Sequence, residues 1–522
     1  MLTNPQRSFL RTLSQLVYCN PFQPERLELE SQALGNEYEQ EDQIAWSKNL
    51  RLEDADRPNV LKLTAKADQI ADLLRSKLTS GTVPDEEALG LYEDLITYVL
   101  YYRHVGKIKV DAALLSDRKS QQVVAKAWQA FQREFNHYLI IPEMQFPLAE
   151  QPEHSFACLF QVRRAFRFVF DNILGDSHPA AEVRAMVWQS VFTYDMRRYR
   201  RALYDRMRDL TTLITGPSGT GKELVARAIS LSQYIPFDSK REQFVADLKD
   251  AFLPVNLSAL SPTLVESELF GHCKGSFTGA IDDRRGWLEA CPPHGAVFLD
   301  EIGELDPTLQ VKLLRVVQQG SYSRTGETEL RQFNGKLLAA TNRDLTQEIQ
   351  AGRFRADLYY RLCSDRIETP SLRVHLKDRP EALEGLIEFI ARRLVGEEAE
   401  VLTAEVSAWI NKQIGPDYPW PGNIRELEQC VRNILVRRHY EPAPVTLSTE
   451  PTRKSLEWLR AAERGTLTSG ELFNYYCTWV YAKLGSYQQT AAALGLDRRT
   501  VRAKIDRKLL ETITEESGVD TP

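Results

Sequence analysis

The sequence predicts a protein of several domains: a mostly α-helical N-terminal domain, a central α/β module with a parallel sheet, and a C-terminal helical domain. The length of 522 residues corresponds to about three domains at roughly 100–200 residues each. In glycine-poor stretches such as 86–104 and 121–138, apolar residues recur at spacings of three and four, which is typical of amphipathic helices. Short apolar runs at 211–216, 296–300 and 336–342 alternate with helical stretches, which indicates a parallel sheet.

Changes in composition along the chain suggest where the domains begin and end. A segment with Pro442, Pro444 and Pro451 among Ser and Thr residues is typical of a linker. We therefore expect a helical domain over 1–174, a central region with a parallel sheet over 175–440, a linker over 441–470 and a small helical domain over 471–522.

The overall composition excludes several classes of protein. The net charge is −6, with 66 basic and 72 acidic residues, so a uniformly basic nucleic-acid-binding surface is excluded and any DNA site must be local. The longest apolar runs, near 95–102 and 138–148, are shorter than the roughly 20 residues of a membrane helix, and the N-terminus lacks a signal pattern. The seven cysteines are scattered without a C-x-x-C pair, which fits a reducing cytoplasm. We expect a cytoplasmic protein with no membrane partner.

The segment G-P-S-G-T-G-K at 216–222 follows an expected strand and opens an expected helix. In this setting glycines let backbone N–H groups surround phosphates, while Lys222 reaches the β and γ oxygens. Glu223 stands where this motif usually has Ser or Thr, so other groups must help to hold Mg²⁺. The predicted nucleotide-binding residues of this loop are Gly216, Pro217, Ser218, Gly219, Thr220, Gly221, Lys222 and Glu223.

Two carboxylates, Asp300 and Glu301, end the apolar run that starts at Ala296. A carboxylate at the C-terminal end of a strand faces the ligand crevice of an open α/β sheet. Asp300 is therefore expected to hold Mg²⁺ through water, and Glu301 to orient and polarise the attacking water. The sequence predicts a site that binds ATP and Mg²⁺ and hydrolyses the nucleotide.

The segment LVESELFGHCKGSFTGA at 264–280 adds a more specific signal. Together with GPSGTGKELVARAI, VFLDEIGEL, AATNRDL, FRADLYYRL and PWPGNIRELE, it closely resembles the AAA+ module of bacterial enhancer-binding proteins, the activators of sigma-54 RNA polymerase. The resemblance covers about 175–435. It implies an α/β ATPase subdomain over 175–370, a helical lid over 371–440 and a regulatory function for the helical domain over 1–174. Other AAA+ ATPases share the phosphate loop but not the insertion GSFTGA.

This resemblance implies functions for individual residues. The insertion would contact sigma-54 with Phe277 and Thr278 at its tip, and it consists of Gly275, Ser276, Phe277, Thr278, Gly279 and Ala280. Six further residues match family positions: Asn256 as the nucleotide-dependent switch of Glu301, Thr341 and Asn342 as sensor I, Arg355 and Arg361 as the pair that reaches the neighbouring subunit's γ-phosphate, and Arg425 as sensor II.

Some residues depart from the family pattern. The loop usually reads GAFTGA, so Ser276 replaces an alanine, and Cys273 stands where Glu is common. The segment 372–383 matches the corresponding family motif only in part. The basic stretch 195–209 is expected to form an exposed helix, with contact to the N-terminal domain or to DNA as the alternatives.

The segment 484–510 resembles a Fis-type helix-turn-helix. A helix of small residues is followed by a turn at Leu496 and Asp497, and a second, basic helix is expected from Arg498 to Leu509. Basic residues on such a helix can contact phosphates and guanine edges. The predicted DNA-binding residues are Arg498, Arg499, Thr500, Arg502, Lys504 and Arg507.

Together these observations favour an ATP-dependent activator that binds upstream enhancer DNA, assembles from dimers into a hexameric ring, and remodels the closed promoter complex of sigma-54 RNA polymerase. An AAA+ remodeller of a different protein target is the alternative, and the GSFTGA insertion with the basic tail disfavours it. A DNA-binding repressor with an inactive ATPase site is a third interpretation, and the intact Lys222, Asp300, Glu301, Arg355 and Arg361 argue against it.

Overall fold

A computed structural model describes residues 1–40, 57–106, 108, 118–246, 248, 251–259, 261–277, 280–415, 418–442, 461–462, 465, 467–506 and 509–510. The chain forms two compact units, Met1–His439 and Tyr440–Pro522, and each is described by itself. Across the described residues, no helix combines the length and the apolar character needed to span a membrane.

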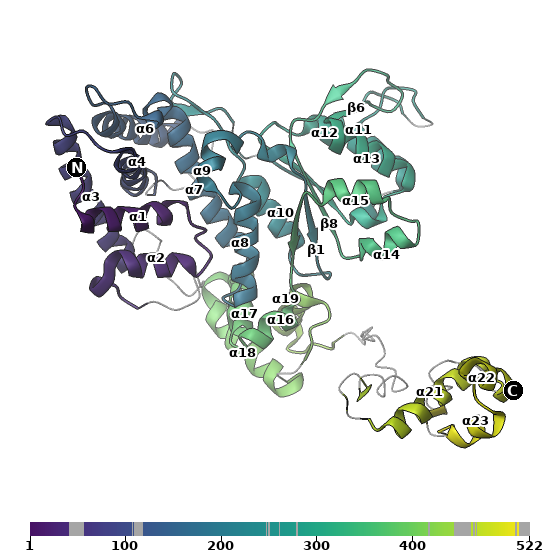
Figure 1. Cartoon of the computed structure of the whole chain (residues 1–522). Helices are drawn as coiled ribbons and strands as arrows, with labels where there is room; N and C mark the ends of the chain where they lie inside the picture. The colour runs from purple at the N-terminus through teal and green to yellow at the C-terminus, as the bar shows by residue number, and fades with distance from the viewer. Residues whose placement is uncertain are drawn as a thin grey trace. The chain divides into compact units, whose positions relative to one another are not determined.

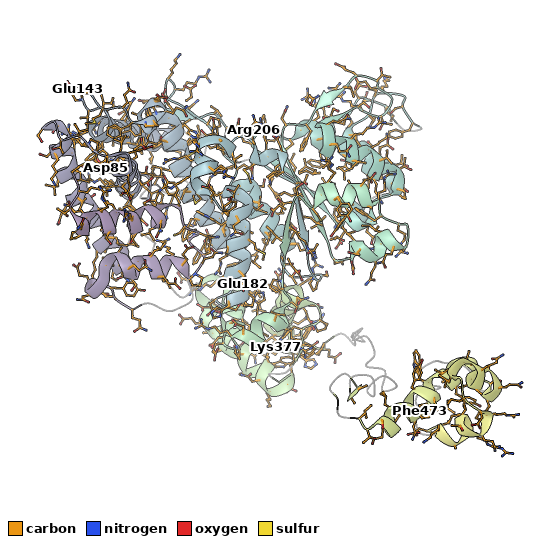
Figure 2. The ribbon with its side chains drawn as sticks, viewed as in Figure 1. Asp85, Glu143, Glu182, Arg206, Lys377 and Phe473 are labelled. Atoms are coloured by element: carbon orange, nitrogen blue, oxygen red, sulfur yellow. The ribbon has the colours of Figure 1, made fainter. Side chains whose placement is uncertain are left out.

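The first part of the larger unit is helical, as predicted. Its core is formed by side chains such as Leu63, Leu95 and Phe131, which are fully buried. Asp85 caps a helix, because its Oδ1 accepts the N–H of Ala88 at 2.7 Å (Figure 2). The elements are α1 (Asn4–Tyr18), α2 (Glu25–Leu34), α3 (Pro58–Thr79), α4 (Glu86–Leu100), a π-helical turn (Tyr101–Val105) and α6 (Arg118–Leu139).

Two long helices, α7 (Pro152–Asn172) and α8 (His178–Phe192), lie between these N-terminal helices and the sheet (Figure 1). Both pack against α10 (Lys222–Leu231), which follows the first strand. One hydrophobic core contains Val169 of α7, Val191 of α8 and Phe298 of the sheet. The N-terminal helices are therefore connected to the sheet through packed apolar side chains.

The central sheet has five parallel strands in the order β4-β5-β8-β1-β9. The three predicted strands are confirmed as β1, β5 and β8. In the register, Asn256 lies opposite Asp300, and Thr215 lies opposite Thr341, so the C-terminal ends of these strands meet at one edge. The strands are β1 (Thr212–Thr215), β4 (Phe252–Asn256), β5 (Ala296–Asp300), β8 (Lys336–Thr341) and β9 (Asp365–Glu368).

Further helices and two short hairpins complete the module. The helices that follow β4 in the chain are α11 (Pro262–Phe270), α12 (Trp287–Ala290), α13 (Pro307–Gln319), α14 (Leu345–Gln350) and α15 (Ala356–Leu362). The hairpins pair β2 (Phe237–Asp238) with β3 (Gln243–Phe244), and β6 (Ser321–Tyr322) with β7 (Arg331–Gln332).

A helical lid follows β9. Its first helix contacts α8, and Figure 2 labels one residue of each, Lys377 and Glu182. The lid helices are α16 (Leu372–Asp378), α17 (Ala382–Val395), α18 (Ala399–Gln413) and α19 (Asn423–Arg437).

The basic stretch 195–209 is not the single helix that the sequence predicted. It consists of α9 (Met196–Arg198), a π-helical turn (Tyr199–Leu203) and a short 3-10 turn (Met207–Asp209). Arg197 forms an ion pair with the buried carboxylate of Asp94 on α4, which also accepts the hydroxyl of Tyr18 at 2.8 Å. The segment therefore contacts the N-terminal helices, which was one of the two alternatives.

The smaller unit contains α21 (Ser469–Leu484), α22 (Tyr487–Leu494) and α23 (Arg498–Lys504). Thr490 and Val501 are fully buried between these helices. The last helix ends at Lys504, earlier than the predicted Leu509, because Ile505 is extended and the N–H of Asp506 donates to Thr478 Oγ1 at 2.7 Å.

Candidate functional site

The phosphate loop connects β1 to α10, and two of its glycines sit where a side chain would clash. Gly216 has φ 145°, and a Cβ there would lie 2.2 Å from Thr369 Oγ1. Gly219 has φ 77°, and a Cβ there would lie 2.3 Å from the carbonyl oxygen of Gly422. Both the left-handed backbone and the close approach require glycine. The loop is thus held between the end of β9 and the lid.

Lys222 is the first residue of α10, and its side chain folds back over the loop. Its Nζ donates hydrogen bonds to the carbonyl oxygens of Gly216 at 2.9 Å and Pro217 at 3.0 Å. Burial lowers the pKa of Lys222, and the nearby charges of Glu301 and Asp300 oppose this shift. The ammonium group therefore lies beside both predicted carboxylates, where phosphate oxygens could replace the carbonyls as its partners.

The two carboxylates lie at the end of β5, as predicted. Asp300 Oδ1 accepts the backbone N–H of Glu301 at 3.0 Å. Glu301 has φ 56°, a left-handed conformation that is uncommon for a residue with a side chain and is often found at functional sites. Its Oε2 accepts the N–H of Asn342 at 3.4 Å, just after the buried Thr341. The carboxylates and the predicted sensor residues therefore converge at one edge of the sheet.

Asn256 ends β4 at the same edge, directly opposite Asp300. Its side-chain oxygen accepts hydrogen bonds from the N–H of Ser258 at 3.0 Å and from Ser258 Oγ at 2.8 Å. The amide group of Asn256 is therefore bonded within its own turn rather than to Glu301. A switching role remains a prediction that would require this turn to open.

An open cleft of about 1200 Å³ runs along this edge of the sheet. Lys222, Asp300 and Glu301 lie at its polar side. The other wall is apolar and is formed by Ile173 and Leu174, which directly follow α7, and by Ala180 and Val183 of α8. Such a division suits a ligand with a charged end and a flat, less polar end. The apolar wall was missed by sequence reasoning because no motif marks it.

The lid closes on the phosphate loop through the start of α19. Arg425 Nη1 donates to Ser218 Oγ at 3.1 Å, and Asn423 Nδ2 donates to the carbonyl oxygen of Ser218 at 2.9 Å. Asn423 also accepts the N–H of Leu372 at 2.8 Å, which joins α16 to the same point. Arg425 was predicted to contact nucleotide, whereas Asn423 was missed although it stands in the same GNIREL motif.

His375 also lines the cleft and was not predicted. Its Nδ1 lies 2.7 Å from Ser177 Oγ. Burial, reinforced by the positive charge of Arg184, lowers the pKa of His375 to about 4, although Asp378 opposes this shift. The imidazole is therefore neutral near pH 7 and adds no charge to the apolar side of the cleft.

The two predicted arginine fingers lie elsewhere, on or beside α15. Neither Arg355 nor Arg361 lines the cleft of its own chain. Arg355 forms a bidentate ion pair with Asp357, with Nη2–Oδ2 at 2.7 Å and Nε–Oδ1 at 3.0 Å, and both side chains are about half exposed. Arg361 is exposed near the end of the helix. Their positions leave both side chains accessible to another molecule.

The described residues of the predicted sigma-54 loop are those at its base, Gly275 to Phe277 and Ala280. Thr278 and Gly279 lie outside the described residues. The N–H of Gly275 donates to the carbonyl oxygen of Ala280 at 2.9 Å, and the Phe277 ring lies edge-on to His272 at 4.9 Å. Ser276 lies against Gly326, where a Cβ would come within 2.6 Å of Ser276 Cβ.

The departure at Ser276 has a structural consequence. Its buried Oγ has no hydrogen-bond partner within the part of the chain that the structure describes. Because an unpaired buried hydroxyl contributes nothing favourable, the commoner alanine would fit the same place.

In the smaller unit, α23 presents basic side chains to solvent. Asp497 caps this helix by accepting the N–H groups of Arg499 and Thr500, both at 2.9 Å. Arg498, Arg499 and Arg502 are exposed, while Thr500 is half-buried. Lys504 Nζ lies 5.9 Å from the centre of the Phe473 ring, which is labelled in Figure 2. Arg507 lies outside the described residues.

The parallel sheet, the phosphate loop, the strand-end carboxylates and the lid together define an AAA+ module. Residues 193–368 match the family model of the sigma-54 interaction domain, so this central region belongs to that family. The resemblance to sigma-54-dependent activators is thereby confirmed.

Known relatives match about half of the chain. A Nif-specific regulatory protein of Azotobacter vinelandii is 42% identical over 45% of this chain and 42% of its own length. The transcriptional regulatory protein ZraR of Salmonella typhimurium is 37% identical over 57% of this chain and 64% of its own length. The chain thus spans less than two thirds of either relative. The crystal structure of NtrX from Brucella abortus, 21% identical, covers 78% of this chain and 88% of that one with a TM-score of 0.38.

Proposed function

We propose that the protein is an ATP-hydrolysing activator of sigma-54 RNA polymerase. The observation that carries this proposal is the convergence of Lys222, Asp300 and Glu301 in one cleft of a sigma-54 interaction domain. The described residues contain no ready-made protein cage of three or more metal-ligating side chains. Asp300 would therefore share Mg²⁺ with water and nucleotide oxygens, which is the usual way this ion is held.

The cleft's own residues fit Mg²⁺-ATP. Gly216 and Gly219 permit close approach of the loop backbone to phosphates, and Lys222 supplies a cation beside them. Bound Mg²⁺ would neutralise charge on the phosphate oxygens. Among the described residues, Glu301 accepts one long hydrogen bond, from the N–H of Asn342 at 3.4 Å, so its carboxylate is available to orient water. The remaining predicted contacts are Pro217, Ser218, Thr220, Gly221, Glu223, Thr341 and Arg425.

Hydrolysis is proposed to need a neighbouring subunit. Arg355 and Arg361 lie away from their own cleft and are exposed, as residues that act in trans must be. An arginine supplied in trans stabilises charge in the transition state. Such a requirement makes turnover depend on assembly of a ring, for which we propose a hexamer. Asn256 would respond to the bound nucleotide by giving up its hydrogen bonds with Ser258 and forming one with Glu301 instead.

The loop from Gly275 to Ala280 is proposed to press on sigma-54 when nucleotide is hydrolysed. Its folded base, with Phe277 supported by His272, supports this role. The helices α22 and α23 are proposed to form a Fis-type helix-turn-helix that binds enhancer DNA in the cytoplasm as a dimer. The exposed arginines at 498, 499 and 502 support phosphate contacts. The helices over 1–174 would regulate the module on which they pack.

The decisive experiment measures open-complex formation by purified sigma-54 polymerase on supercoiled DNA beside ATP turnover. Thr278→Ala should retain most ATP turnover and fail to form open complexes, because the loop is separate from the cleft. Ser276→Ala is the matched control within the loop, and it should retain both activities because it removes only an unpaired hydroxyl.

Two results would contradict the proposal. Loss of both activities in Thr278→Ala would mean that the loop and the cleft are not separable. Retention of both would favour the alternative, an AAA+ remodeller that acts on a different protein.

A further inference from the structure

A second cavity lies among the N-terminal helices, away from the phosphate loop. It is bounded by α1, the end of α4 with its π-helical turn, α7 and α8, which are found together in Figure 1. About 650 Å³ inside it is free of protein atoms, part of it open to solvent. Its lining is mainly apolar and aromatic, and includes Leu16, Tyr98, Tyr101, Tyr102, Phe166 and Trp188.

Trp188 contributes a buried polar group to this cavity. The residue is only 2% exposed, and its indole N–H has no acceptor within the described part of the chain. A buried tryptophan N–H usually has a hydrogen-bond partner. Leaving a buried donor unpaired costs free energy, because the donor has lost its bond to water. The nitrogen itself is covered by its neighbours, so a bound molecule with an acceptor atom would restore the missing bond when the indole ring turns its N–H toward the cavity.

The aromatic wall is shaped by the π-helical turn Tyr101–Val105. Single π-helical turns inside helices are frequent at functional sites. This turn follows α4 and brings three tyrosines together, with the Tyr98 and Tyr102 rings 4.7 Å apart and the Tyr101 and Tyr102 rings 4.9 Å apart. Clustered ring faces and edges favour a flat aromatic ligand.

The charges near the cavity favour an uncharged ligand. Arg26 lines the cavity, and its Nε donates to the buried carboxylate of Glu30 at 2.9 Å. Cys19 also lines it, and burial raises the pKa of its thiol to about 12, so the thiol stays protonated. The wall therefore presents a paired arginine and a neutral thiol rather than a free charge.

We propose that this cavity binds a small, neutral, aromatic molecule that carries a hydrogen-bond acceptor, which the indole N–H of Trp188 recognises. The same two helices line the nucleotide cleft. On α7, Phe166 lies in the cavity and the last residue, Asn172, lies in the cleft, and on α8, Trp188 lies in the cavity and Val183 in the cleft. Filling the cavity therefore changes the packing of helices that shape the nucleotide site.

The test uses two probes of the same shape, quinoline and naphthalene, with the full-length protein in equilibrium dialysis. Quinoline has a ring nitrogen that accepts a hydrogen bond and is uncharged near neutral pH, whereas naphthalene has no acceptor. Quinoline should bind about fivefold more tightly, the effect of one net hydrogen bond. Failure of both probes to bind, or equal binding, would overturn the proposal.

Variants then assign the preference to the cavity. Trp188→Phe should abolish the preference for quinoline while naphthalene still binds. The matched control is Trp128→Phe, which removes an indole from the N-terminal core outside the cavity and should keep the preference. Val162→Phe fills the cavity from α7 and should weaken both probes. Each variant should melt at the wild-type temperature, which shows that it is folded. Unchanged quinoline binding in Val162→Phe would show that quinoline binds outside this cavity.

The link to the cleft rests on the proposed function and has its own measurement. Quinoline at saturation should change ATP turnover of the wild type but not of Val162→Phe. A protein that binds quinoline through Trp188 without any ATP turnover would contradict the proposed function and leave the cavity assignment intact. Normal ATP turnover without quinoline binding would contradict the cavity assignment and leave the proposed function intact.

Discussion

The nucleotide cleft and the N-terminal cavity are lined by the same two helices but use different chemistry. The cleft combines backbone groups of a glycine-rich loop with Lys222, Asp300 and Glu301. The cavity combines aromatic side chains with one buried donor, the indole N–H of Trp188. The cleft is suited to binding a charged ligand and reacting with it, whereas the cavity is suited to binding an uncharged ligand without a reaction.

This comparison suggests how the two regions could influence each other. The residues at the cleft that follow α7 or belong to α8, such as Ile173 and Val183, are apolar and provide shape rather than charge. A ligand in the cavity would therefore alter the fit of nucleotide without touching the proposed catalytic groups. We therefore expect two kinds of variant: those that change ATP hydrolysis in the cleft, and those that change how the cavity influences the cleft.

The largest effect is expected at the proposed arginine fingers. Arg361→Ala should lower ATP turnover by about 10³- to 10⁵-fold, because the neighbouring cleft loses transition-state stabilisation. Quinoline binding in the N-terminal cavity should not change. Mixing Arg361→Ala with Lys222→Ala should partly restore turnover, measured as phosphate release. Absence of any recovery in mixed rings that demonstrably form would contradict catalysis in trans.

Lys222→Ala should weaken ATP binding by about 10- to 100-fold, the effect of losing a charged hydrogen-bond donor. Fluorescent nucleotide titration measures this change. Arg227→Ala is a suitable control, because Arg227 is exposed on the same helix and does not line the cleft. ATP affinity equal to the wild type in Lys222→Ala would exclude the cleft as the phosphate site.

The contact between the basic segment and the N-terminal helices can be broken at Arg197. Arg197→Ala leaves the buried Asp94 without its cationic partner, so the free energy of unfolding should fall by about 1.5–3 kcal/mol. Urea unfolding followed by circular dichroism measures this loss. Arg198→Ala is the control, since Arg198 is exposed and its Nε lies 3.7 Å from Asp195. Equal stability of the two variants would show that the Arg197 contact contributes nothing.

A smaller, pH-dependent effect is expected at His375. Burial lowers the pKa of His375 in the folded protein from 6.5 to about 4, so the unfolded chain binds a proton first as pH falls. This contribution to stability is complete above pH 6.5 and is lost progressively down to about pH 4. His375→Gln should flatten the fall in melting temperature over this range. His178→Gln, at an exposed position, should leave it unchanged.

The meeting of Lys222, Asp300 and Glu301 in one cleft could be predicted, because a phosphate-binding loop is made of residues that are neighbours in sequence. The loop from Gly216 to Lys222 and the pair after β5 are contiguous motifs, and the structure brings them together. Ile173 could not be predicted as part of the cleft, since any apolar residue of a helix is more simply explained as core. The same holds for Trp188, whose unpaired N–H becomes visible only when its surroundings are known.

Two further differences show how local bonds override a sequence pattern. The predicted helix to Leu509 ends at Lys504, because Thr478 from another helix binds the N–H of Asp506. The basic segment near Arg197 resembled a solvent-exposed helix, but a buried acid more than one hundred residues earlier, Asp94, pairs with it. Such partners are distant in the chain and leave no periodic signal.

The central claim is that Glu301 activates water in the cleft, and Glu301→Gln tests it most directly. ATP turnover should fall by about 10²- to 10⁴-fold while ATP affinity stays near the wild-type value, because only the catalytic proton acceptor is lost. The matched control is Glu304→Gln, three residues later, where the carboxylate pairs with Arg343 and does not line the cleft. Wild-type turnover in Glu301→Gln, with Glu304→Gln also active, would contradict the account.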